Sequence, residues 1–239
     1  MLPAHELYQY KPFDGSSHLW AQNILAKISP QAAVLDFGAG SGCMGNYLKS
    51  IDITDIYAVE IDPEAQEHLS TIYKEVKDDI SAFDGKKFDV VLLLDILEHL
   101  PNPRSFLQQL KSYLAKDALI LVSIPNIAHW SIRFSLLFGS FNYTERGILD
   151  RSHLHFFTRK SFKHLIKESG FSTLELSQSV IPLELILPKW LYSNIFFKFF
   201  TLIRKSGARL HPSFGAFQHL ALLKAPSEEF FEDKISTLN

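Results

Sequence analysis

The sequence predicts an α/β fold built on a doubly wound, largely parallel sheet. Short apolar runs alternate with segments of helical periodicity along the first half of the chain, which places helices on the faces of a sheet. The run 88–94 is almost continuously apolar, as expected of a strand that is covered on both faces. A glycine-rich turn follows the first apolar run, where nucleotide-binding sheets of this class contact their ligand.

Proline and glycine residues mark where the expected elements begin and end. Pro30 and Pro125 break the chain on either side of the alternating region, and Pro63 suits the first turn of a helix. The expected strands are 33–37, 56–60, a short one ending at 78–80, 88–94, 118–124, 171–179 and 217–223. The expected helices are 16–28, 43–50, one from Pro63, one after Pro103, 127–138 and 159–169. These elements form a Rossmann-like seven-stranded sheet with a helical lid and insertions in the C-terminal half.

The whole chain, 1–239, is expected to form a single domain. Its parts are an N-terminal cap (1–30), a cofactor-binding core (31–125), a lid or acceptor region (126–170) and an aromatic insertion before the last strand (181–213).

Composition excludes several classes of function. A hydrophobic share of 46% and a charged share of 21% are ordinary for a globular protein. The formal net charge of −2 gives no basic field, so no nucleic-acid partner is expected. Cys43 is the single cysteine, which rules out an intramolecular disulfide framework and a cysteine-rich zinc site. The start of the chain lacks an apolar secretory core, so a cytoplasmic location is expected.

The turn after the first strand is the most specific feature of the sequence. Residues 34–42 read Val-Leu-Asp-Phe-Gly-Ala-Gly-Ser-Gly, with glycines at alternate positions. Glycine has no Cβ, so a ligand can approach the backbone closely, and a following helix directs unpaired N–H groups at it. The spacing is not G-x-G-x-x-G, and Asp36 precedes the first glycine. This pattern favours S-adenosylmethionine, whose ammonium group the acid can meet, over a dinucleotide.

Acids also follow the next two expected strands. Glu60 lies twenty positions after Gly40, where an acid binds ribose hydroxyls in nucleotide-binding sheets. The alternative for Glu60 is a solvated acid at a strand end. Asp79 could accept the adenine amino group, with Asp78 as a surface residue, or the two could exchange roles.

These segments, together with Asp95-Ile96-Leu97-Glu98-His99-Leu100-Pro101, resemble the class I S-adenosylmethionine-dependent methyltransferases in order and spacing. The likeness covers about residues 30–125. It implies that Asp36 and the turn hold the methionine end of the cofactor, that Glu60 holds the ribose, and that Asp95 lies at the edge of the methyl-transfer site. The full set of implied cofactor-binding residues is Asp36, Gly38, Ala39, Gly40, Gly42, Glu60, Ile61, Asp79, Ile80 and Asp95.

A second likeness lies beyond Pro125. The segments 125–133 and 150–158, the second reading Asp-Arg-Ser-His-Leu-His-Phe-Phe-Thr, together resemble a bacterial subgroup linked to cell-surface polysaccharide and sugar modification. Ser152 and His155 stand where that subgroup usually has threonine and arginine. The segment 125–133 is also similar to proteins associated with methionine biosynthesis. The likeness implies an acceptor oxygen on a sugar, a glycan or a related small metabolite.

Histidines are the candidates for removing a proton from such an acceptor. His153, with Asp150 three residues before it to orient the ring or raise its pKa, and His99, beside the expected site, lead over His129 and His155. The alternative for each is a structural histidine bonded to a backbone carbonyl. No ligand spacing indicates a metal, so none is expected.

Aromatic and basic residues of the lid are the candidates for binding the acceptor. These are His129, Trp130, Arg133 and Tyr143; the alternative is that they pack a helical lid onto the core. Residues 181–205 are apolar and aromatic but are interrupted by Glu184 and Pro188, so they do not read as a membrane span. A cover over the sheet or a homodimer interface ranks first for them, and peripheral contact with the inner membrane face ranks second.

The sequence therefore predicts an S-adenosylmethionine-dependent methyltransferase with a small-molecule or glycan oxygen as acceptor. The alternatives are a quinone-like or carboxylate acceptor, a non-catalytic protein of the same fold that binds a partner, and a nicotinamide-dependent oxidoreductase. The turn spacing and Asp36 argue against the last.

Overall fold

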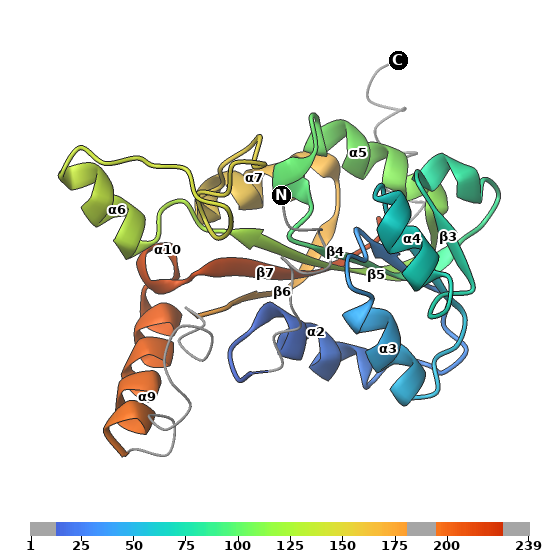
Figure 1. The fold of residues 1–239 in the computed structure, drawn as a ribbon, viewed down its shortest axis with the longest axis horizontal. Coiled ribbons are helices and arrows are strands. Elements are labelled where there is room, and N and C mark those ends of the chain that lie inside the picture. The colour runs from blue at the N-terminus through green and yellow to red at the C-terminus, as the bar shows by residue number, and fades with distance from the viewer. Residues whose placement is uncertain (1–12, 181–194, 227–239) are drawn as a thin grey trace.

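One mixed sheet organises the protein, with its strands in the order β3-β2-β1-β4-β5-β7-β6 (Figure 1). The structure, a computed structural model, describes residues 13–180 and 195–226. Strand β7 runs antiparallel to both of its neighbours, β5 and β6, while the other pairs are parallel. The predicted seven-stranded α/β sheet is confirmed. The strands are β1 (Val34–Phe37), β2 (Ile56–Val59), β3 (Glu75–Lys77), β4 (Phe88–Leu94), β5 (Leu114–Pro125), β6 (Ser172–Gln178) and β7 (Gln218–Lys224).

The helices alternate with the strands up to β5 and then cluster between β5 and β7. The α-helices are α2 (Ser17–Leu25), α3 (Cys43–Ser50), α4 (Pro63–Leu69), α5 (Pro103–Leu110), α6 (Trp130–Leu137), α7 (Arg159–Ser169), α9 (Ile195–Leu210) and α10 (Pro212–Gly215). Within the described residues there are also three short 3₁₀-helices, η1 (Ile80–Phe83), η2 (Leu97–His99) and η3 (Lys111–Tyr113).

Polar side chains fix the starts of the helices. The Asp62 carboxylate accepts the N–H of Glu64 at the start of α4, with Pro63 in the first turn as predicted. Thr158 and Ser161 form a reciprocal capping box on α7, and Gly170 ends that helix in the left-handed conformation. Helix α6 begins at Trp130, later than expected, because the ring of His129 caps it.

Two apolar clusters lie on opposite faces of the sheet. One face packs against α2, α3 and α4 through residues such as Leu25, Leu48 and Leu69. The other packs against α5 and α7 through residues such as Leu107 and Phe162. Figure 1 shows α2 and α3 on one side of the sheet and α5 and α7 on the other. Because β1 and β4 are neighbours whose following helices leave to opposite faces, a crevice opens at their carboxyl ends.

Helices α6 and α9 extend from the same end of the sheet (left in Figure 1). The predicted aromatic insertion contains α9 and ends within α10. Its part 181–194 lies outside the described residues, as do residues 1–12 of the predicted cap. In the part of the chain that is described, no helix has both the length and the apolar character to cross a membrane.

Replacing Phe88 with alanine tests the packing under the sheet. Phe88 is fully buried, and its ring lies 5.6 Å from that of Tyr57 and 5.7 Å from that of Phe83. We expect Phe88→Ala to lower the free energy of unfolding by ~3–5 kcal/mol, since the cavity cannot collapse between strands. Phe138→Ala, at a residue that is 82% exposed, is the control, and we expect its free energy of unfolding in urea to change by less than ~0.5 kcal/mol. Similar losses in the two variants would contradict this packing.

Candidate functional site

A cavity of about 400 Å³ lies at the carboxyl ends of β1, β2 and β4. Most of its wall comes from the three loops that follow these strands, so it occupies the crevice where the strand order reverses. The lining residues are His18, Asp36, Phe37, Gly38, Ala39, Gly40, Ser41, Cys43, Met44, Val59, Glu60, Ile61, Leu94, Asp95, Ile96, His99, Leu100 and Ser152.

The glycines of the turn serve two purposes. Gly38, Gly40 and Gly42 have φ of +74°, +53° and +71°, a region that L side chains rarely adopt. A Cβ on Gly38 would lie 2.2 Å from the Ile96 side chain, and one on Gly42 would lie 2.6 Å from that of Ile72, so both neighbours would have to move in addition to the backbone strain. At Gly40 the nearest such contact is 4.0 Å away, which leaves open space on the cavity side.

Glu60 fastens the turn to the next helix. One carboxylate oxygen accepts the N–H of Gly40 at 2.8 Å, and the other accepts those of Ile61 and Asp62 at 2.9 and 3.1 Å. Only 7% of the residue is exposed, so the alternative of a solvated strand-end acid is wrong. The carboxylate lies at the cavity wall, where it can also accept hydrogen bonds from a ligand.

Asp36 is buried beside the turn and paired with a tyrosine that the sequence did not single out. The Tyr73 hydroxyl donates to Asp36 at 2.5 Å and accepts the N–H of Gly45 at 3.0 Å. A side chain on Gly45 would come within 2.4 Å of the Tyr73 ring, so this glycine makes room for the tyrosine. Burial, together with the charge of Glu60, raises the pKa of Asp36 to about 6, against the lowering effect of the Tyr73 hydrogen bond.

Hydrogen bonds from residues far along the chain, Ser123 and Gln218, fix the Asp95 carboxylate. Its φ is +58°, a strained value for a non-glycine residue. Its carboxylate accepts the Ser123 hydroxyl at 2.7 Å and the Gln218 amide at 2.6 and 2.5 Å. The Ser179 hydroxyl donates to the Gln218 carbonyl at 2.7 Å, which turns the amide nitrogen towards Asp95. Ser123 and Gln218 come from β5 and β7, and nothing in their sequence context pointed to this role.

The residues predicted on the adenine side divide into two groups. Ile61 lines the cavity and is 81% exposed, so an apolar surface is available there. Asp79 is not among the lining residues: its exposed carboxylate caps η1 by accepting the N–H of Ser81 at 2.8 Å, which lowers its pKa. Ile80 is also absent from the lining and lies in the core, with 1% exposed. The short β3 ends before these residues, so the 3₁₀-helix carries them away from the cavity edge.

Beyond Asp95, the structure brings together Glu98, His99 and His153. The two imidazole rings lie 4.8 Å apart at 73°, and Nε2 of His153 lies 4.0 Å from a Glu98 carboxylate oxygen. Glu98 is 1% exposed, and neither carboxylate oxygen has a hydrogen-bond partner among the described residues. Burial, and then the charges of Asp95 and Asp150, hold its pKa well above the usual range.

The two histidines have different access to the cavity. His99 lines it, while His153 lies behind with 8% of its surface exposed. Burial, together with the neighbouring His99, lowers the pKa of His153. The Ile148 carbonyl oxygen, 3.1 Å from Nδ1, orients the His153 ring in place of the predicted Asp150, whereas the charge of Asp150 does act to raise the pKa of His153, as predicted, against the larger effect of burial. Asp150 instead accepts the N–H and hydroxyl of Ser152 at 2.9 and 2.6 Å, which shapes the turn that carries His153.

None of the four predicted acceptor residues is among those lining the cavity. His129 is fully buried, and burial lowers its pKa to about 4; its Nδ1 lies 2.7 Å from the Ser131 hydroxyl. Arg133 donates to the Ala128 carbonyl at 2.6 Å. Trp130 and Tyr143 are 41% and 48% exposed on the lid. For His129 and Arg133 the structural alternative is therefore the one observed, because the lid uses their polar atoms to fix its own backbone.

His155 also takes the structural role, since its Nε2 lies 3.2 Å from the Pro101 carbonyl oxygen.

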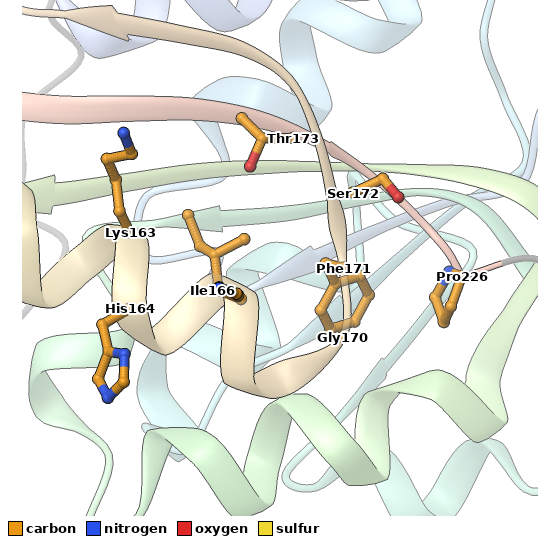
Figure 2. Close-up of a pocket in the computed structure, with 9 residues that line it drawn as sticks. Lys163, His164, Ile166, Gly170, Phe171, Ser172, Thr173 and Pro226 are labelled. Carbon is orange, nitrogen blue, oxygen red and sulfur yellow. The ribbon is translucent and has the colours of Figure 1, made fainter. Parts of the chain in front are cut away.

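A separate cavity of about 430 Å³ lies between α7 and the start of β6 (Figure 2). Figure 2 shows Lys163 and His164 on the helix, and Ser172, Thr173 and Pro226 beside it. The start of β6 pairs with the end of β7, and this cavity lies beside that pair. It is therefore at the opposite edge of the sheet from the glycine turn, which follows the carboxyl end of β1.

A family model described as "Methyltransferase domain" matches residues 12–176 of the chain. Among curated relatives, the ubiquinone biosynthesis O-methyltransferase of Glaesserella parasuis is 32% identical over 106 residues, covering 39% of this chain and 45% of that protein. The (S)-tetrahydroprotoberberine N-methyltransferase of Eschscholzia californica is 27% identical over 114 residues, covering 44% and 32%. The chain thus matches less than half the length of these relatives.

Solved structures share the fold at low identity. A Burkholderia thailandensis 1,6-didemethyltoxoflavin-N1-methyltransferase, solved with S-adenosylhomocysteine, gives a TM-score of 0.55 at 17% identity, covering 90% of this chain and 80% of that one. An Archaeoglobus fulgidus S-adenosylmethionine-dependent methyltransferase gives 0.53 at 21%, covering 90% and 96%. The [4+2]-cyclase SpnF gives 0.57 at 11%, covering 91% and 86%, so the fold alone does not fix the reaction.

Replacing Tyr73 with phenylalanine tests the network behind the turn. The change removes the hydroxyl that serves both Asp36 and Gly45, and leaves two buried polar groups without their partner. We expect Tyr73→Phe to lower the free energy of unfolding by ~1–3 kcal/mol in urea denaturation. Tyr143→Phe, in a half-exposed ring, is the matched control and should be neutral. An unchanged stability for Tyr73→Phe would show that water replaces the hydroxyl.

Proposed function

The chain belongs to the methyltransferase-domain family, with S-adenosylmethionine as its cofactor, and on this premise we propose that it methylates a hydroxyl group of a small molecule. The observation that carries the proposal is that one cavity connects the glycine turn and Glu60 to Asp95 and His99. A ligand held at the first pair of features therefore reaches the second pair.

The residues present suit the cofactor. The buried carboxylate of Asp36 offers a negative charge to the cationic amino-acid end, and Gly40 leaves the backbone accessible. Glu60 offers acceptor oxygens for ribose hydroxyls, and exposed Ile61 offers an apolar surface to the adenine. Asp79 and Ile80 remain predictions for the adenine side. When bound, the cofactor supplies a methyl group on a positively charged sulfur.

The chain's own residues then have to align the acceptor and receive its proton. Asp95 is a rigid wall of the cavity, because Ser123 and Gln218 fix both of its oxygens. His99 lines the cavity, and it belongs to a group with Glu98 and His153, which are not among the residues lining the cavity. We assign this group the removal of the hydroxyl proton, with Asp150 as a residue that positions His153 through the 150–153 turn.

We propose a sugar or glycan hydroxyl as the first candidate acceptor, supported by the likeness of segment 150–158 to the polysaccharide-linked subgroup. A phenolic hydroxyl is the second candidate, supported by the ubiquinone O-methyltransferases among the relatives. Trp130 and Tyr143 stay candidates for acceptor contact, since Tyr143 packs near Phe156 and that ring near His153. Peripheral membrane contact through 181–205, a homodimer and a cytoplasmic location remain predictions.

Binding and turnover test the proposal in sequence. We expect calorimetry to show micromolar binding of S-adenosylhomocysteine, at least tenfold weaker in Glu60→Ala, because ribose and turn both lose the carboxylate. Glu67→Ala, an exposed acid on the following helix, is the matched control and should bind normally. No binding of S-adenosylhomocysteine would overturn the proposal.

Methyl transfer is then measured with labelled S-adenosylmethionine against nucleotide-linked sugars and against catechols. Transfer to the sugars supports the first candidate, and transfer to catechols alone selects the second. Binding without transfer to either class would favour a non-catalytic protein of this fold.

Cofactor binding should depend on pH through Asp36. Because the pKa is raised in the folded state, protonation of Asp36 favours folding. This contribution to stability is complete at pH values below the ordinary pKa of 3.8 and is lost as the pH rises through about 6. An ammonium group needs the ionised form, so affinity for S-adenosylhomocysteine should fall about tenfold between pH 7.5 and pH 5. Calorimetry at both pH values checks this. Asp36→Asn should bind weakly with a flat profile; a full slope in that variant would assign the dependence to another group.

A further inference from the structure

The Glu98–His99–His153 group contains a buried carboxyl group whose oxygens accept no hydrogen bond from the described residues. Both oxygens of Glu98 lack a hydrogen-bond partner among the described residues, although only 1% of the residue is exposed. An isolated buried carboxylate is costly unless it is paired with a cation or coordinates a metal. Asp95 and Asp150 add further negative charge nearby.

Backbone carbonyls hold the same nitrogen, Nδ1, in both imidazoles, and Nε2 of His153 lies 4.0 Å from the Glu98 carboxylate. Nδ1 of His153 faces the Ile148 carbonyl at 3.1 Å, and Nδ1 of His99 faces the Ser152 carbonyl at 3.3 Å. A carbonyl only accepts, so Nδ1 carries the proton in each ring and Nε2 keeps its lone pair. A backbone carbonyl behind a neutral imidazole is the arrangement that orients metal-ligating histidines.

We propose that Glu98, His99 and His153 bind a divalent transition-metal cation. One ligand atom from each residue lies within 4.8 Å of the others. Ligands of one zinc ion lie about 3.4 Å apart, since Zn–N bonds are near 2.1 Å, so binding draws the three side chains together by rotations of His99 and Glu98. The ion would satisfy the orphaned carboxylate and take up both free nitrogens.

The donor set selects the class of ion. Two imidazoles and one carboxylate suit Zn²⁺, Fe²⁺ or Co²⁺, whereas Mg²⁺ and Ca²⁺ prefer oxygen ligands alone. Three protein ligands also leave coordination positions open, as in catalytic rather than structural sites.

The location gives the ion a role that rests on the proposed function. His99 lines the cavity beside Asp95, so an open coordination position can face an acceptor hydroxyl there. A cation lowers the pKa of such a hydroxyl. With the ion bound, Glu98, His99 and His153 act through it as its ligands and do not themselves accept the proton. The hydroxyl releases its proton to water, its oxygen forms the new bond to the methyl carbon, and the bond between that carbon and the cofactor sulfur breaks, which leaves S-adenosylhomocysteine. Vicinal oxygens, as in a sugar diol or a catechol, would be preferred acceptors.

Titration of the chelator-treated full chain with Co²⁺, followed by visible absorption, tests the site directly. We expect one equivalent to bind with a tetrahedral or five-coordinate spectrum, and Zn²⁺ to displace it. Glu98→Gln, nearly equal in shape, should weaken Co²⁺ binding at least tenfold, and His153→Gln should do the same. His155→Gln is the matched control: it lies in the same segment, faces the Pro101 carbonyl, and should keep the full affinity.

S-adenosylhomocysteine binding serves as the check on folding in every variant and separates the two proposals. A variant that binds S-adenosylhomocysteine normally but has lost Co²⁺ supports the site. Absence of Co²⁺ and Zn²⁺ binding in the wild type, or equal affinity in Glu98→Gln and His155→Gln, overturns the site and leaves the proposed function standing. Metal binding without any binding of S-adenosylhomocysteine would overturn the proposed function and leave the site.

Discussion

Three buried carboxylates at one edge of an apolar sheet are the constraint on which this structure depends. Burying a carboxylate costs free energy unless hydrogen bonds or a cation offset it, and the three are compensated differently. Asp36 has the Tyr73 hydroxyl, and Glu60 has three backbone N–H groups from the turn and the next helix start. Glu98 has no such partner among the described residues. The glycine turn and the first residues after β2 direct their N–H groups at Glu60. Residues Leu154 and His155 bond to the Glu98 backbone carbonyl.

The antiparallel strand β7 ties the end of the sheet to its centre. It inserts between β5 and β6, and its first residue, Gln218, reaches Asp95 at the end of β4. Ser179, just after β6, fixes the amide of Gln218, so the two last strands determine the orientation of an acid in the first half of the chain. The strained φ of Asp95 persists because these bonds over-determine it. Segments near the end of the described chain therefore complete a site whose glycine turn lies near its beginning.

The lid contributes to the site through its backbone more than through the side chains first expected to bind an acceptor. The carbonyl oxygens of Ile148 and Ser152 orient the two imidazoles, and the Glu98 carbonyl in return accepts the N–H groups of Leu154 and His155. His129 and Arg133 stabilise the lid from within. For the proposed acceptor side, the residues at the cavity wall are therefore Asp95, His99 and Ser152.

The sequence by itself determined the seven strands, the glycine turn and the placing of Asp36, Glu60 and Asp95 at strand ends. These follow from local rules: apolar periodicity, positive φ at glycines, and the common direction of parallel strands. Only the tertiary structure decided that Tyr73 pairs with Asp36, that Gln218 holds Asp95, and that His153 joins Glu98 and His99. The tertiary structure also decided that the Ile80 side chain is buried in the core. Contacts between residues far apart in the chain depend on packing and loop paths, and no sequence spacing records them.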